Sequence, residues 1–134
     1  MKNNYEKIHV STEKGIDIVN LTDEVKEKLG NVEIKKGTCT VFNPGSTASI
    51  IINEDEPMLR KDLKDKLSEL VEENKVYHHP SNGHSHIRSI LLGPSETIPI
   101  INGELDMGTW QEIMLIEMDI KPRKREVTVV FQGK

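Results

Sequence analysis

Short segments in which apolar and polar residues alternate run through most of this chain, and Gly, Pro and Asn separate them. Alternation with a period of two is typical of β-strands that bury one face. Asn102-Gly103, between two such segments, is a hairpin signal. The pattern predicts strands at residues 5–12, 16–19, 36–43, 48–52, 97–101, 104–107, 113–118 and 127–131. A chain of 134 residues is expected to form one domain, residues 1–134.

Three other segments have the spacing of an amphipathic helix. A first helix is predicted over residues 22–30, with Thr22 as the N-cap and Gly30 at its end. The longest helix is predicted over residues 58–73. Its apolar stripe is Leu59, Leu63, Leu67, Leu70 and Val71, and its charged positions form a solvated face. The third helix follows the histidine-rich segment and ends at Gly93-Pro94.

Composition excludes several classes of partner. Hydrophobic residues make up 35% of the chain and aromatic residues 4%, which predicts a modest core. The net charge of −4 gives no basic balance that would favour nucleic acid. No apolar run approaches the roughly 18–20 residues of a membrane span, and the start lacks a signal-peptide core. The single Cys39 fits a reducing compartment. We therefore expect a cytoplasmic protein without a nucleic-acid or membrane partner.

Four of the five histidines lie between residues 78 and 86. Pro80-Ser81-Asn82-Gly83 within this segment is a turn signal. If the turn closes a hairpin, His79, His84 and His86 share one face. Three imidazoles with an open fourth position make a bound metal reactive, and neutral nitrogens suit zinc or another late first-row ion. The alternative is a solvated polar loop.

Polar residues elsewhere are candidates for a ligand site. Arg88 lies in the first turn of the third helix, where it is placed to face a phosphate or diphosphate, or else is simply exposed. Asn53 and Glu54 follow a buried strand, and their alternative role is to start a turn. Trp110, the only tryptophan, either packs in the core or offers a flat platform for a heteroaromatic ring.

Several separated motifs together resemble one family. They are Pro44–Ala48, Asn53-Glu54, Tyr77–His79, Asn82–Arg88, Leu92–Ser95, Ile98-Pro99 and Leu105–Gln111. The set resembles the YjbQ family of secondary thiamine-phosphate synthases, over about Tyr5 to Gly133. The resemblance implies an α+β fold, with mostly antiparallel sheets forming a sandwich-like core and about three helices. It also implies a homotrimer with a histidine site near a subunit boundary.

This sequence departs from the commoner family pattern at two positions. Many members carry a histidine where Gly45 stands, and they often lack one at the position of His84. Our interpretation is that His84 replaces the imidazole that other members carry at the position of Gly45. The loop between His79 and His84 is also shorter than in most members.

The resemblance further implies an activity that joins a pyrimidine diphosphate to a thiazole phosphate. For this reaction we predict Glu54 and His79 as catalytic groups, and His79, His84 and His86 as ligands of the divalent metal. The substrate-binding candidates are Ser46, Thr47, Asn53, Arg88, Trp110 and Gln111. Two alternatives remain open, a metal-assisted phosphohydrolase and a non-catalytic module that binds a metal or phospholigand. The enzyme hypothesis requires Glu54 to reach the metal.

Overall fold

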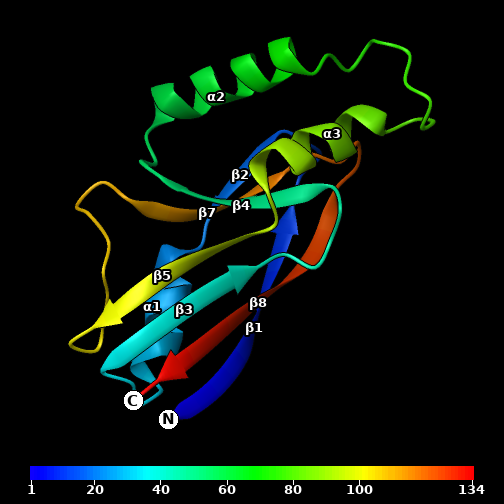
Figure 1. The fold of residues 1–134 in the computed structure, drawn as a ribbon. Coiled ribbons are helices and arrows are strands. Elements are labelled where there is room, and N and C mark those ends of the chain that lie inside the picture. Colours follow the sequence, from blue (N-terminus) through cyan, green and yellow to red (C-terminus); the bar gives the residue numbers. More distant parts are fainter.

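The computed structural model describes residues 1–134 and contains eight strands and three helices (Figure 1). In chain order they are β1 (Lys2–Thr12), β2 (Asp17–Asn20), α1 (Thr22–Gly30), β3 (Lys36–Phe42), β4 (Ala48–Asn53), α2 (Pro57–Leu70), α3 (Gly83–Leu92), β5 (Ser95–Ile101), β6 (Glu104–Leu105), β7 (Glu112–Glu117) and β8 (Arg123–Gly133). One sheet has the order β1-β8-β3-β5-β6 and the other β2-β7-β4, and every pairing is antiparallel. The predicted α+β fold is confirmed.

The main hydrophobic core contains 17 buried residues, drawn from strands of both sheets and from α1. On β8 every second side chain is buried, namely Val127, Val129 and Phe131, as the predicted alternation requires. Cys39 on β3 lies opposite Phe131, and burial raises the pKa of its thiol to about 12. Cys39 is therefore an inert part of the core.

The other face of the three-stranded sheet carries a smaller apolar cluster, which α2 helps to cover (Figure 1). Glu56 caps α2, because its carboxylate accepts hydrogen bonds from Met58 N and Leu59 N at 3.0 and 2.7 Å. Within α2 only Leu67 is fully buried. Of the predicted apolar stripe, Leu67 and Val71 are buried, whereas Leu70 is 74% exposed and does not pack against the sheet. None of the helices is both long and apolar enough to cross a membrane.

The hairpin predicted around the histidine-rich turn is wrong, because Gly83 begins α3. Ser85 N and His86 N donate to Asn82 O at 3.0 and 3.3 Å, so the turn leads directly into helical hydrogen bonding. Residues two apart on a helix point about 200° apart, whereas on a strand they share a face. His84 and His86 therefore lie on different sides of α3.

Candidate functional site

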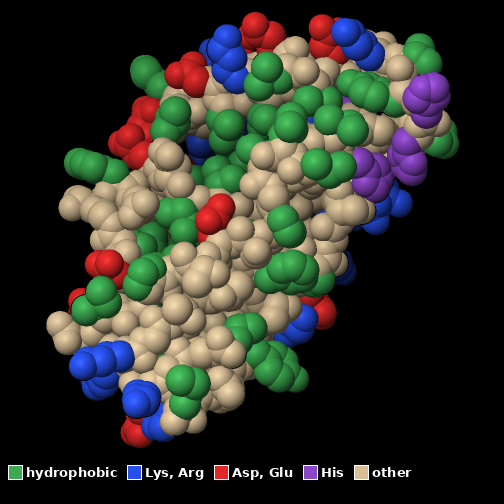
Figure 2. All heavy atoms as spheres, viewed as in Figure 1, with side chains coloured by type: hydrophobic (Ala, Val, Ile, Leu, Met, Phe, Trp, Pro, Cys, Tyr) green, Lys and Arg blue, Asp and Glu red, His purple; other side chains and the backbone are tan.

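We use the term histidine niche for two adjoining cavities that share His86 as a lining residue. One has a volume of about 330 Å³ and is lined by Tyr77, His78, His79, Gly83, His86 and Ile87. The other has a volume of about 230 Å³ and is lined by Gly45, Ser46, Ala48, His86, Ser89, Ile90 and Pro94. Figure 2 shows histidine side chains grouped at this end of the molecule, where α3 begins.

Two imidazoles meet in the niche. The rings of His79 and His86 lie edge to face, with centroids 4.7 Å apart and planes at 76°. His79 Nε2 is 3.1 Å from Asn82 Oδ1, which orients the exposed His79 ring. The pair offers two nitrogen groups for binding a ligand, moving a proton or holding a metal.

His84 lies in a different environment. It is only 4% exposed, its ring centroid is 6.4 Å from that of Tyr77, and its Nε2 is 3.7 Å from Glu73 Oε1. Burial lowers the pKa of His84, and the positive charge of Arg88 lowers it further. Because its pKa lies below the usual 6.5, His84 is neutral at pH 7.

The predicted convergence of His79, His84 and His86 does not occur within one chain. No group of three or more His, Cys, Asp or Glu side chains is arranged to hold a metal ion. The physical reason is the helical path after Gly83, which separates His84 from the other two rings. The three-histidine donor set therefore does not fit a metal within a single chain.

The side chain of Arg88 is buried, and its guanidinium group does not line the niche. Its Nε and Nη2 both donate to Val71 O, at 3.1 and 2.8 Å. Val71 caps the C-terminal end of α2, where carbonyl groups lack helical partners. Arg88 thus ties α3 to the end of α2.

Beneath the niche lies a network of buried charges that sequence reasoning missed. Glu117 and Asp119 are 0% and 1% exposed. Arg125 binds Glu117 through two hydrogen bonds, Nε to Oε1 at 2.7 Å and Nη2 to Oε2 at 2.6 Å. Arg123 Nε donates to Asp119 Oδ2 at 2.8 Å. Buried carboxylates are stable only with such partners.

Asp119 links the two sides of the niche. Its carboxylate accepts from Asn82 Nδ2 and from Thr47 Oγ1, each at 3.3 Å. Burial by itself raises the pKa of Asp119, but hydrogen bonds from Ile120 N–H, Arg123 and Asn82 outweigh it and lower the pKa to about 2. Asp119 is therefore an anion at working pH and holds the His79 turn near the 44–47 loop.

The 44–47 loop offers several unused hydrogen-bond donors. The backbone N–H groups of Ser46 and Thr47 have no acceptor within the chain. Gly45 lies close to Arg125, since a Cβ at this position would be 2.8 Å from Nη1. Arg125 Nη1 makes no hydrogen bond. The only buried side-chain nitrogen or oxygen without a partner is Ser85 Oγ, so Arg125 Nη1 is accessible to solvent. Free N–H groups beside a guanidinium suit an anion.

Comparison with known proteins places the chain in a family. The family described as "UPF0047 protein YjbQ-like" matches residues 6–134. This chain belongs to the YjbQ family. A UPF0047 protein from Methanothermobacter thermautotrophicus is 36% identical over 132 residues, covering 96% of this chain and 92% of that protein. The UPF0047 protein YugU from Bacillus subtilis is 31% identical over 129 residues, and the match covers 94% of this chain and 97% of YugU. The recognition made from the motifs is confirmed.

Solved structures agree with this membership. The crystal structure of a YbjQ-like protein from Sulfolobus solfataricus superimposes with a TM-score of 0.96 at 34% identity, covering 99% of both chains. A protein from Aeropyrum pernix gives a TM-score of 0.93 at 33% identity, with 98% of this chain and 99% of that chain covered. The YjbQ fold is therefore shared along almost the whole length.

The other site residues predicted for this YjbQ-family chain lie at the opposite end of β4 from the niche. They are Asn53, Glu54, Trp110 and Gln111. Ala48 lines the niche, while Asn53 ends the six-residue strand and Glu54 follows it. A strand of that length spans about 17 Å. Within one chain, Glu54 therefore does not reach the two niche imidazoles.

Trp110 and Gln111 lie near Asn53, because β7 starts at Glu112 and pairs with it there. Trp110 is 71% exposed, so it is not a core residue. Gln111 Oε1 accepts from Gly108 N at 2.8 Å and so stabilises its own loop.

A sequence signal for the missed network does exist. Glu117 ends the apolar run of β7, and Asp119 follows two residues later. Arg123 and Arg125 occupy alternate positions at the start of β8, so their side chains share a face. Charged residues next to an apolar run are rarely buried without partners, and arginines in strand alternation are suitable partners.

Proposed function

We propose that the histidine niche binds the phosphate group of a small phosphorylated molecule. The observation that carries this proposal is the set of unused donors in and next to the 44–47 loop, part of which lines the niche. They are the N–H groups of Ser46 and Thr47 and the Nη1 of Arg125. Backbone N–H groups that have no acceptor within the chain are available to a ligand, and a phosphate oxygen would accept hydrogen bonds from them.

We further propose that the chain is an enzyme, with an activity similar to that of a thiamine-phosphate synthase. In that reaction the bond between a pyrimidine methylene carbon and diphosphate breaks, and its electron pair stays on diphosphate. A thiazole nitrogen supplies the pair for the new carbon–nitrogen bond. Arg125 and the N–H groups of the 44–47 loop would stabilise the charge on the departing diphosphate. His79 and His86 would donate hydrogen bonds to its oxygens.

The proposal also includes a metal ion, held by two histidines of the chain in place of the three that the sequence predicted. His79 and His86 would provide two nitrogen ligands for zinc or another late first-row ion, and donors from outside the chain would complete the coordination. Such an ion, when bound, would supply Lewis-acid stabilisation to phosphate oxygens.

We also propose a homotrimer in which the niche lies at a subunit boundary. The α3 residues Ile87, Ile90 and Leu91 are 42%, 74% and 61% exposed, and Ile87 and Ile90 line the niche itself. Figure 2 shows hydrophobic side chains on the surface formed by α2 and α3. An apolar surface that borders a polar site is typical of an interface between subunits.

A second candidate is a module that binds a phospholigand without turnover. The separation of Glu54 from the niche favours it, because no carboxylate that is free to exchange a proton with a ligand lines either cavity. A phosphohydrolase, in which water replaces the thiazole, would need the same missing base.

The test is calorimetric titration with pyrophosphate, combined with a turnover assay. Arg125→Lys keeps a cation beside Glu117 but removes Nη1, and we expect pyrophosphate affinity to fall about tenfold. Lys124→Ala, at the exposed neighbouring position, is the matched control and should bind like the parent. Unchanged affinity in Arg125→Lys would refute the anion site.

Turnover is measured with a pyrimidine-methyl diphosphate and a thiazole phosphate, with and without added zinc. Product formation that is lost in His86→Asn supports the enzyme. Tight pyrophosphate binding without product under either condition supports the binding module.

A further inference from the structure

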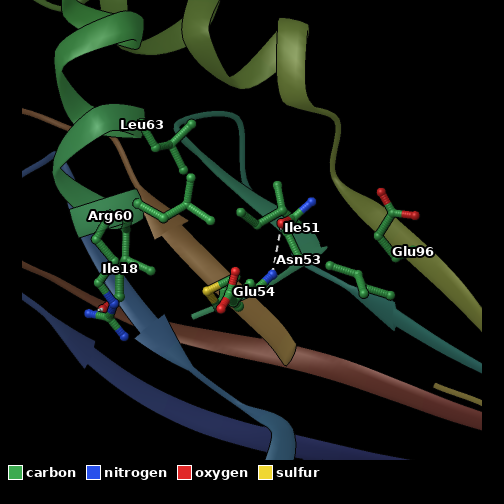
Figure 3. A pocket seen from close by; sticks show the side chains of 10 residues that line it. Ile18, Ile51, Asn53, Glu54, Arg60, Leu63 and Glu96 are labelled. Carbon is green, nitrogen blue, oxygen red and sulfur yellow. Dashed lines mark hydrogen bonds between the residues drawn. The ribbon is translucent and has the colours of Figure 1, made fainter. Parts of the chain in front are cut away.

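A separate cavity of about 380 Å³ lies between α2 and the three-stranded sheet. Six apolar side chains line it, namely Ile18, Ile51, Ile52, Leu59, Leu63 and Met114. In Figure 3, Leu63 extends from α2 toward the sheet, and Ile51 lies across the same space on β4. We call this cavity the α2 cleft. Its volume lies within the range of about 300–1,000 Å³ that is usual for small-molecule sites.

The cleft is kept open by contacts at both ends of α2. Near the start of the helix, Arg60 forms a fork on Asp55, with Nε to Oδ1 at 2.5 Å and Nη2 to Oδ2 at 2.8 Å. Its Nη1 donates to Ile18 O on β2 at 2.9 Å. At the other end, Leu67 is buried in the small apolar cluster. Because α2 is held at these two points, the space between them is a fixed feature of the fold.

The charges that remain free at the cleft are negative. All three guanidinium nitrogens of Arg60 are used by Asp55 and by the Ile18 carbonyl. Glu54 and Glu96 also line the cleft, and neither carboxylate takes part in a hydrogen bond or ion pair. Figure 3 shows Glu96 on the opposite side of the cavity from Arg60. The cleft therefore combines apolar walls with two unpaired carboxylates.

We propose that the α2 cleft binds a small molecule with an apolar body and a positively charged amine. The body would displace water from the isoleucine and leucine side chains. The ammonium group would form charge-assisted hydrogen bonds with Glu54 or Glu96. This site takes a ligand of opposite charge to that of the histidine niche and lies at the other end of β4.

The test compares three probes of equal chain length by NMR titration of the full chain: n-hexylamine, hexanol and hexanoate. We expect hexylamine to bind several-fold more tightly than hexanol, because an ion pair with a solvent-accessible carboxylate contributes up to about 1 kcal/mol. The shifted signals should belong to Ile51, Ile52 and Met114. Hexanoate should bind more weakly than either of the other two.

The variant Glu54→Gln/Glu96→Gln removes both charges at constant size, and its hexylamine affinity should fall to that of hexanol. Glu27→Gln, an exposed position on α1, is the matched control and should bind like the parent. Leu63→Trp fills the cavity and should abolish binding of all probes. Equal binding of hexylamine and hexanoate, or parent-like hexylamine affinity in the double variant, would overturn the proposal. Absence of any shift at Ile51 and Met114 would also overturn it.

Discussion

The histidine niche and the α2 cleft lie at opposite ends of β4 and are built on different principles. Side chains around the niche are held by buried ion pairs, in which Asp119 joins segments that are distant in sequence. The walls of the cleft are apolar, and its free carboxylates belong to Glu54 and Glu96. We therefore expect substitutions that remove a charge to be most destabilising at the niche. Substitutions that change side-chain volume should have their main effect at the cleft.

The largest effect is expected from Glu117→Ala beneath the niche. The substitution leaves the Arg125 guanidinium partly buried without the Glu117 carboxylate, which accepts two of its hydrogen bonds. Breaking a buried ion pair in this way costs about 3–5 kcal/mol of unfolding free energy. Glu126→Ala on β8, where the side chain is exposed, should change the free energy by less than about 0.5 kcal/mol. Urea denaturation measures both, and a loss below about 1 kcal/mol in Glu117→Ala would mean that the ion pair does not stabilise the niche.

At the cleft, the matched pair of substitutions is Leu67→Ala and Leu59→Ala in α2. Leu67 is 4% exposed and packs in the small apolar cluster, so its truncation should cost about 3 kcal/mol. Leu59 is 36% exposed and lines the open cleft, so its truncation should cost less than about 1 kcal/mol. Thermal or urea unfolding gives the two values. Equal losses would show that the cleft is closed in solution.

The acid sensitivity of the niche gives a third, smaller effect. The pKa of Asp119 is about 2 in the folded chain, below the usual 3.8. A carboxylate with a depressed pKa contributes stability that is present above its unfolded pKa and is lost as pH falls through the folded pKa. About 2 kcal/mol should therefore disappear between roughly pH 4 and pH 2. Asp119→Asn should not show this component, and an identical acid profile in parent and variant would contradict the role given to Asp119.

Much of the fold follows from local sequence pattern. The helix predicted over residues 22–30 matches α1, and the alternation in residues 127–131 matches the buried face of β8. Such features depend on periodicity within one segment, which the sequence displays directly. Even here, Thr22 is not the N-cap, since Leu21 occupies that place and Thr22 Oγ1 accepts from Ile113 N at 2.8 Å.

The candidate site was harder to predict, because its geometry depends on contacts between distant residues. The Pro-Ser-Asn-Gly turn signal marks a reversal but does not specify whether a strand or a helix follows. The partner of Arg88 is a carbonyl 17 residues earlier, and that of Asp119 is a threonine 72 residues earlier. Neither pairing leaves a local pattern. His79 and His86 were predicted as functional candidates from the histidine cluster around the turn and from the family resemblance, and the structure brings these two rings together.

The central claim is that the niche and the cleft are two independent sites with opposite charge preference. The most direct measurement is an NMR titration of one nitrogen-labelled sample, first with pyrophosphate and then with n-hexylamine. We predict that pyrophosphate shifts the amide signals of Ser46 and Thr47 and leaves those of Ile51 and Met114 in place, whereas hexylamine does the reverse. Pyrophosphate that leaves Ser46 and Thr47 unshifted, or two ligands that shift the same set of residues, would contradict the account.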